Sequence, residues 1–303
     1  MDRLHAMSVF VAVAETKGFA AAARRLQLSA PAVTRAVAAL EARLGVRLLA
    51  RTTRHVRVTA AGQRYLEDAR RVLLEVDAAD EAAAGVNAEP RGHLSVTAPA
   101  LFGRMFVMPG VVDYLARYPG ADVSVVLLDR VVNLLEEGMD VGVRIGELPD
   151  STLNALRVGS VRVVLCASPQ YLHRHGRPDT PDALSAHSII VSQAGIDALD
   201  WRFRTGSGLR AAAIRPRLTV TTNDAAIEAA RLGFGITRLL SYQVAPQLAS
   251  GELELVLEAF EPLARPIHIV HREGHHASAK VRCFVDLIAA RLRGEGALRY
   301  SKA

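Results

Sequence analysis

Between residues 30 and 40 the sequence carries one hydroxyl group and one guanidinium group among small and apolar side chains. Apolar residues recur there at spacings of four, three and four, which predicts a helix with one buried stripe: Val33, Val37, Leu40 and Leu44. The opposite side presents Thr34 and Arg35 among small neighbours, so it fits the major groove of DNA, where a guanidinium can bind a guanine edge. We therefore predict a DNA-binding face made of Ser29, Ala30, Pro31, Thr34 and Arg35.

A second short helix is predicted just before this one, over residues 19–26, with a tight turn between the two. Ser29 can cap the second helix by accepting hydrogen bonds from its first N–H groups, and Pro31 is tolerated in a first turn. The turn contains Gln27, although a glycine would adopt a left-handed conformation there at lower cost. The alternative for this segment is a pair of alanine-rich core helices that do not contact DNA.

The positive charge of the chain is concentrated in its first part. Residues 1–65 contain 11 Lys and Arg against 3 Asp and Glu, a net charge of +8, whereas residues 66–303 contain 26 against 28, a net charge of −2. Such an asymmetry is expected when one module faces a polyphosphate and the rest of the chain does not. It therefore favours double-stranded DNA as the partner of the N-terminal part.

Two short strands are predicted after the helix pair, over residues 46–50 and 55–58, with the polar turn 51–54 between them. This hairpin would form a wing whose polar side chains lie near the DNA backbone or minor groove: Arg51, Thr52, Arg54 and Arg57. A solvated, arginine-rich loop is the alternative for this segment taken alone.

Residues 59–87 contain no proline and two glycines, which predicts one long helix that Thr59 can cap. An apolar stripe follows it: Leu66, Ala69, Leu73, Val76 and Ala83. At 1.5 Å per residue the helix is roughly 40 Å long, which suits pairing with a second copy better than a compact domain. A single solvent-bridging helix is the alternative, but its stripe would stay in water. We therefore predict a homodimer, with two DNA-binding heads for two half-sites.

Residues 89–92 break this helix and mark a hinge, and the residues that follow are enough for a two-lobed domain. Predicted strands alternate there with predicted helices: strands over 93–97, 122–128, 140–145 and 161–165, helices over 110–118, 131–138 and 224–232. This alternation indicates α/β units with mostly parallel sheets. A strand over 266–271 and a helix over 277–293 return to the first lobe, so two crossings are predicted, near residues 160–167 and 262–267.

The candidates for a ligand site lie at the ends of predicted strands. Residues 97–103 join a strand to a helix start, where backbone N–H groups favour an anionic ligand group. Arg144 can supply a guanidinium for a carboxylate, and residues 222–224 open another helix. A cap, a turn or a surface ion pair is the simpler explanation of each residue taken singly. The full candidate effector-binding set is Pro99, Ala100, Leu101, Phe102, Arg144, Ile145, Gly146, Thr222 and Asn223.

The order of these segments resembles the LysR family of transcriptional regulators. The resemblance covers the whole chain and is carried by the helix pair, by residues 44–53 (LGVRLLARTT) and by residues 58–62 (VTAAG). It implies an α+β multi-domain protein whose effector-binding half resembles the two-lobed α/β fold of type 2 periplasmic binding proteins. The implied parts are a winged helix-turn-helix DNA-binding domain (1–58), a dimerising linker helix (59–88), a hinge (89–92) and an effector-binding domain (93–303), with lobe I about 93–161 and 267–303 and lobe II about 162–266.

The resemblance also implies a function, that of a ligand-responsive DNA-binding transcriptional regulator. Such a protein would bind an interrupted palindrome as a dimer or tetramer, and a small anionic effector would modulate it in a cleft where the strand-end residues converge. The partners would be promoter DNA, the effector and further copies of the chain, with RNA polymerase as an additional candidate. In many relatives position 30 holds a glutamine that reads a base edge, whereas Ala30 lacks that hydrogen-bonding group.

Other chemistry has little support in the sequence. Cys166 and Cys283 lack CxxC spacing, and His271, His275 and His276 lack a neighbouring Cys or paired acid, so neither a cofactor nor a metal is expected. No HExxH, P-loop or GxSxG motif occurs, so we do not expect an enzyme.

Two further observations bear on where the chain acts. Residues 1–14 superficially resemble a signal peptide, but their helical periodicity predicts the first helix of the DNA-binding head instead. No uncharged apolar run reaches the roughly 20 residues that cross a bilayer, so we expect a cytoplasmic protein without membrane contact. The alternative function is small-molecule binding or transport with a basic oligomerisation arm, but a transport receptor would need a signal peptide and no basic head.

Overall fold

The computed structural model describes residues 2–51, 56–84, 89–148, 153–194, 199–206, 208–272 and 277–299. The chain forms two compact units, Met1–Ala88 and Glu89–Ala303. The predicted hinge over residues 89–92 starts at the boundary between these units, and its last residue already belongs to a strand.

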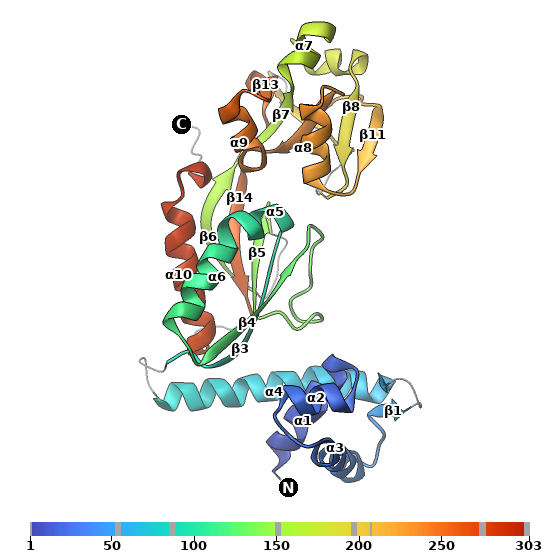
Figure 1. The fold of residues 1–303 in the computed structure, drawn as a ribbon, viewed down its shortest axis with the longest axis vertical. Coiled ribbons are helices and arrows are strands. Elements are labelled where there is room, and N and C mark those ends of the chain that lie inside the picture. Colours follow the sequence, from blue (N-terminus) through green and yellow to red (C-terminus); the bar gives the residue numbers. More distant parts are fainter. Residues whose placement is uncertain are drawn as a thin grey trace. The chain divides into compact units, whose positions relative to one another are not determined.

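The described part of the N-terminal unit contains three helices, a hairpin and a long helix, which is the order of a winged helix-turn-helix with its linker (Figure 1). The bounds are Arg3–Thr16 (α1), Phe19–Arg25 (α2), Ala30–Leu44 (α3), Leu49–Arg51 (β1), Val56–Val58 (β2) and Ala60–Ala84 (α4). Val33, Val37 and Leu40 are buried in a core that α1 shares, so the predicted helix pair and its stripe are confirmed. Strands β1 and β2 pair antiparallel, as predicted for the wing.

Helix α1 belongs to this core, as predicted from its periodicity, because it buries residues such as Phe10 and Val13. Among the described residues no single helix is long and apolar enough to cross a membrane. Helices α1 and α2 reach the length and apolar composition of a membrane span only when they are taken together, and a bend of 119° separates them.

Helix α4 packs against the head with its first half. Thr59 caps it, since its Oγ1 accepts a hydrogen bond from the N–H of Gly62 at 2.9 Å. Leu66 and Ala69 are buried in the head core, and Leu73 packs against that core. The prediction that the stripe needs a second chain is therefore wrong for this half, because the same chain already covers it.

The C-terminal unit contains a sheet in each of two lobes (Figure 1). In the first lobe the strand order is β4-β3-β5-β14-β6, with bounds Ala121–Leu127, Gly92–Ala98, Val141–Ile145, Arg265–His271 and Asn154–Val161. A helical segment follows β3: α5 (Ala100–Phe102), a π-helical turn (Gly103–Val107) and α6 (Met108–Arg117). The last helix, α10 (Ala279–Gly294), lies beside α6 and packs on the same sheet, so both ends of this unit build the first lobe, as predicted.

In the second lobe the strand order is β11-β8-β12-β7-β13, with bounds Pro216–Val220, Ile189–Ser192, Ile236–Leu240, Val163–Ala167 and Glu254–Val256. Three helices accompany this sheet: α7 (Pro169–His175), α8 (Asn223–Arg231) and α9 (Ser241–Ser250). A small hairpin made of β9 (Arg202–Thr205) and β10 (Gly208–Ala211) adjoins the sheet. Buried Trp201 and Phe203 join the hairpin to the core of this lobe.

The chain crosses between the lobes where it was predicted to, from β6 to β7 at Arg162 and from β13 back to β14. The prediction of mostly parallel sheets is confirmed, since four strands of each sheet run in one direction and only the fifth runs against them. Strands β3, β4 and β5 are parallel, but β14 runs antiparallel to β5 and β6, and β7 runs antiparallel to β12 and β13. The parallel strands end at the junction of the lobes. Strands β7 and β14 start at that junction, directly after the two crossings, so each must run in the opposite direction.

Two predicted elements differ from the structure. Residues 131–138 do not form a helix but a set of turns, in which the side chain of Asn133 accepts hydrogen bonds from the N–H groups of Leu135 and Glu136. Val132 and Leu134 are buried while Val131 and Leu135 are exposed, so the apolar spacing did not mark one helical face. The predicted strand over 161–165 is divided between β6 and β7, because the chain passes from one lobe to the other there.

Candidate DNA-binding surface and ligand cavity

The exposed side of α3 carries the predicted DNA-binding residues. Ser29 caps the helix, accepting a hydrogen bond from the N–H of Ala32 at 3.3 Å. Ala30, Pro31 and Arg35 are exposed, and Thr34 is half-buried beside them. Arg35 makes no hydrogen bond or ion pair with any residue that the structure describes, so its guanidinium is available to an external partner.

The turn before α3 is as tight as predicted. Gln27 adopts a φ of 53°, the left-handed conformation that glycine reaches at lower cost. The backbone N–H of Leu28 then bonds to the carbonyl of Ala23 at 2.9 Å, which directs the chain from α2 into α3.

The wing is described only at its two strands. Arg57 is exposed on β2, and Arg51 ends β1 opposite Val56. Thr52 and Arg54 lie outside the described residues, as does the side chain of Arg51, so their predicted contacts with DNA stay predictions.

Glu41 joins α3 to the wing, a role that the sequence did not reveal. Its carboxylate is only 4% exposed and accepts hydrogen bonds from the backbone N–H groups of Leu48 at 2.8 Å and Leu49 at 3.0 Å. Arg47 adds an ion pair at 3.0 Å. Burial alone would raise the pKa of Glu41, but these hydrogen bonds and the charge of Arg47 outweigh it and hold the pKa below its ordinary value. The carboxylate is therefore ionised and holds the wing against α3.

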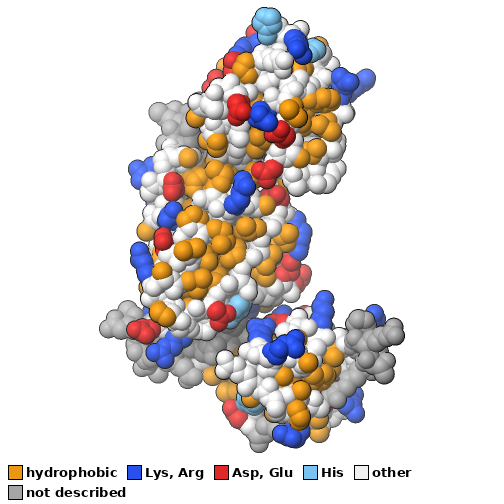
Figure 2. Space-filling model, viewed as in Figure 1, with side chains coloured by type: hydrophobic (Ala, Val, Ile, Leu, Met, Phe, Trp, Pro, Cys, Tyr) orange, Lys and Arg blue, Asp and Glu red, His pale blue; other side chains and the backbone are white. Residues whose placement is uncertain are grey.

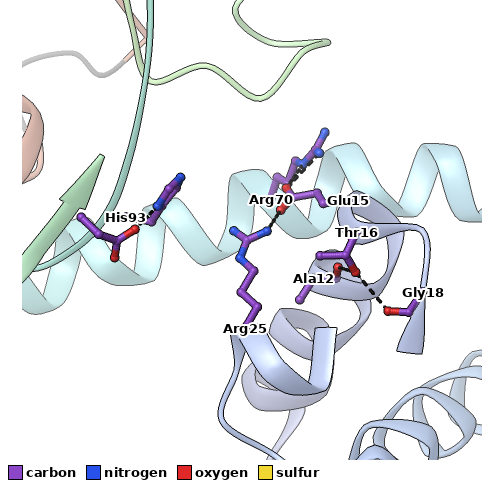
Figure 3. Close-up of polar contacts among 8 residues, drawn as sticks. Ala12, Glu15, Thr16, Gly18, Arg25, Arg70 and His93 are labelled. Atoms are coloured by element: carbon purple, nitrogen blue, oxygen red, sulfur yellow. Dashed lines mark hydrogen bonds and ion pairs between the residues drawn. The ribbon is translucent and has the colours of Figure 1, made fainter. Parts of the chain in front are cut away.

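Glu15 of α1 holds three helices of the N-terminal unit together. Figure 3 shows its carboxylate between Arg25 of α2 and Arg70 of α4, at 2.7 Å and 2.9 Å. Two basic side chains of the N-terminal unit are thereby paired within it. Figure 2 shows further Lys and Arg side chains on the visible surface of this unit, where they can face a polyanion.

A cavity of about 120 Å³ lies between the two lobes. The first lobe contributes Pro99, Asp129 and Ile145, all at the ends of parallel strands, where ligands of open α/β sheets bind. The rest of the lining comes from the crossings and the second lobe: Val163, Ser192, Ala194, Trp201, Asn223, Arg238, Leu239, Leu240, Tyr242, Gln243 and Arg265.

The structure brings only some of the predicted effector-binding residues to this cavity. Pro99, Ile145 and Asn223 line it, and Ala100 adjoins it through a hydrogen bond to Asp129. Leu101 and Phe102 are instead 5% and 0% exposed and belong to the hydrophobic core. Thr222 does not line the cavity, because its hydroxyl caps α8 by accepting a hydrogen bond from the N–H of Ala225.

Arg144 does not line the cavity either. It alternates with Ile145 along β5, so the two side chains point to opposite faces of the sheet. Its guanidinium donates to the carbonyl oxygen of Val132, and burial lowers its pKa from the ordinary value. Gly146, two residues further along, has a φ of 124° and does not line the cavity.

Three charged residues of the cavity were missed from the sequence: Asp129, Arg238 and Arg265. Arg238 donates to the carbonyl of Asp200 at 2.9 Å, and its guanidinium lies 5.4 Å from the centre of the Trp201 ring. Two signals in the sequence could have revealed these residues. Arg238 is a charged residue inside the apolar run 236–240, and Asp129 is an acid directly after the predicted strand 122–128.

Burial raises the pKa of Cys166 to about 12, so its thiol stays protonated at neutral pH. No group of His, Cys, Asp and Glu within the described ranges has the arrangement of a metal site.

Comparisons with known proteins agree with this architecture. The family described as "Bacterial regulatory helix-turn-helix protein, lysR family" matches residues 4–63, and the family described as "LysR substrate binding domain" matches residues 87–293. The second match alone covers more than half of the chain.

Relatives match over nearly their whole length. A transcriptional repressor of Pseudomonas aeruginosa is 33% identical over 95% of this chain and 92% of its own, and the transcriptional activator AaeR of Escherichia coli is 32% identical over 94% and 93%. The structure of CrgA, a LysR-type regulator from Neisseria meningitidis, matches with a TM-score of 0.62 at 30% identity, over 96% of this chain and 99% of that one. The chain therefore belongs to the LysR family, and it is a ligand-responsive, DNA-binding transcriptional regulator.

Proposed function

We propose that this regulator binds an interrupted palindrome in promoter DNA through the exposed side of α3 and through the wing. The observation that carries this proposal is Arg35, which is exposed beside the small residues Ala30 and Pro31 and has no partner within the described part of the chain. The net charge of +8 over residues 1–65 adds attraction to phosphate that does not depend on sequence. The site of action is the cytoplasm, where the DNA is, with RNA polymerase as a further partner at the promoter.

We infer that the chain acts as a dimer that pairs through the second half of α4. The first half packs on its own head, but Val76 lies one turn beyond Leu73 and continues the stripe. We keep the domain limits that were predicted from the sequence: the head over 1–58, the linker over 59–88 and the effector domain over 93–303. Tetramers through contacts between effector domains are the alternative assembly.

We infer that a small anionic effector binds in the cavity between the lobes. Arg238 and Arg265 supply guanidinium groups for its acid, while Ile145 and Trp201 supply apolar surface. A closed cavity of 150 Å³ can hold benzene, so a cavity of about 120 Å³ has room for a small organic compound. An effector that binds the closed lobes more tightly than the open ones would favour closure, and closure would change the spacing of the two heads. A coupling free energy of about 1–3 kcal/mol would be enough for this change to act as a switch.

Footprinting on the DNA upstream of the regulator's own gene tests the proposal. We expect two protected half-sites on one face of the double helix, with protection that weakens steeply as salt is raised. Addition of the effector should then change the length of the footprint or the affinity. A single protected half-site, or protection that does not depend on sequence, would contradict the paired, specific reader proposed here.

A further inference from the structure

The helix start that was expected to bind a ligand anion is already occupied by an acid of the chain itself. The backbone N–H of Ala100 donates a hydrogen bond to Oδ1 of Asp129 at 3.0 Å. A ligand carboxylate at that position would displace this bond and face a like charge. The part of the cavity beside Pro99 therefore suits a hydrogen-bond donor or a cation, not an anion.

Asp129 has no cationic partner among the residues that the structure describes. The hydrogen bond from Ala100 is its one polar contact there, and the charge that acts on its pKa is that of another carboxylate, Asp224. Arg104, at 3.7 Å, pairs with Asp224 instead. Burial raises the pKa of Asp129 from its ordinary value, the Ala100 hydrogen bond lowers it, and Asp224 raises it further. A half-buried carboxylate without a cation is costly, so a cationic ligand group would relieve that cost.

The opposite charge lines the same cavity from other elements. Asp129 follows β4 in the first lobe, whereas Arg238 lies on β12 in the second lobe. Arg238 is held by the carbonyl of Asp200 and by the Trp201 ring, so its guanidinium is positioned before a ligand arrives. The cavity thus offers an acid from the first lobe and a base from the second, with a further base, Arg265 at the start of β14, and apolar surface beside them.

We propose that the effector is a small amphoteric compound, whose protonated amine binds Asp129 and whose acid group binds Arg238. One molecule would then connect Asp129 of the first lobe with Arg238 of the second, and a compound without the amine would lose the contact with Asp129. This inference rests on the proposed function, since it names the ligand class of the same cavity. The small volume favours short amino acids whose amine and acid are separated by a few bonds.

The test is calorimetric titration of the full-length protein at pH 7.5 with matched pairs of compounds. Each pair differs only in an amine: propanoate with alanine and with 3-aminopropanoate, butanoate with 4-aminobutanoate, and pentanoate with 5-aminopentanoate. We expect at least one amine-bearing compound to bind about tenfold more tightly than its amine-free partner, as for one added charge-assisted hydrogen bond. The proposal is overturned if no amine-bearing compound binds, or if the plain acids bind equally well.

Two variants locate the effect within the cavity. Asp129→Asn keeps the size of the side chain and should abolish the preference for the amine, whereas Asp224→Asn, the matched control at the neighbouring carboxylate, should keep it. Asp129→Glu retains the charge and should keep part of the preference, which separates loss of charge from loss of fold. A preference that survives in Asp129→Asn overturns the proposal. If the plain acids bind as tightly as the amine-bearing compounds, and if this binding requires Arg238, the effector is anionic as in the proposed function, and the amphoteric effector is contradicted.

Discussion

The carboxylate of Glu41 in α3 accepts a hydrogen bond from the backbone N–H of Leu48 at 2.8 Å, and this contact ties the recognition helix to the wing. Glu41→Gln should destabilise the N-terminal unit by about 1–3 kcal/mol, because a buried charged acceptor is lost. Denaturant unfolding measures the loss. Glu67→Gln, at an exposed position of α4, is the control and should have little effect.

The same residue predicts a dependence of stability on pH. The pKa of Glu41 is lowered in the folded protein, so its contribution is present above the pKa of the unfolded chain, about 4.5, and is lost as the pH falls through the folded value. The stability difference between wild type and Glu41→Gln should therefore narrow below pH 4.5. A difference that stays constant down to low pH would show that Glu41 acts through its shape and not its charge.

Gly62 lies where α4 passes close to the backbone of the wing. A Cβ added there would lie 2.0 Å from the carbonyl oxygen of Leu48, which cannot move away as a flexible side chain can. Gly62→Ala should therefore lower stability by about 1–3 kcal/mol or separate α4 from the head. In Gly18→Ala the nearest atom is at 3.8 Å, so this variant should unfold at nearly the wild-type temperature in a thermal scan.

The ionised side chain of Asp129 should lower the free energy of unfolding of the ligand-free protein. Its folded pKa is raised above the ordinary value of 3.8, so ionisation costs more in the folded chain than in the unfolded one. Asp129→Asn should therefore raise the unfolding temperature at pH 7.5, and the gain should disappear as the pH falls toward 4. Calorimetry of both proteins across this range checks the sign. An unchanged or lower unfolding temperature at pH 7.5 would mean that Asp129 has a stabilising partner.

Val76 tests how the chain assembles. Val76→Glu places a charge in the proposed seam of α4, beyond the residues that pack on the head, so it should convert dimers to monomers that still fold. Light scattering with gel filtration measures the mass. Gln63→Glu adds the same charge at an exposed position near the start of α4 and should leave the dimer intact. An unchanged mass for Val76→Glu would place the interface elsewhere.

Local periodicity was enough to predict the head. Val33, Val37 and Leu40 share one face of α3 whatever surrounds the helix, and the turn at Gln27 follows from the short distance between the two helices. The functions of Glu41 and Asp129 could not be read in this way. Glu41 bonds to amides of another element, and Asp129 bonds to Ala100, which is 29 residues away.

The alternation of side chains along a strand explains why Arg144, a candidate for binding the effector, does not line the cavity. Its neighbour Ile145 faces the cavity, so Arg144 faces the other side of β5, where a carbonyl of the turn 131–138 binds it. That turn was itself mistaken for a helix, and its contacts could not be foreseen. The cations of the cavity lie instead on β12 and β14, on strands whose place in the sheets depends on the two crossings.

The most direct measurement is the affinity of the Arg35→Ala variant for the operator, by fluorescence anisotropy at constant salt. Arg43→Ala is the matched control, because it removes the same charge from the far end of the same helix. We predict that Arg35→Ala weakens operator binding by about 1–3 kcal/mol and random-sequence binding by less, while Arg43→Ala changes both only slightly. An equal loss on random DNA would make Arg35 a phosphate contact. A folded Arg35→Ala protein with unchanged operator affinity would contradict the claim that this face of α3 reads DNA.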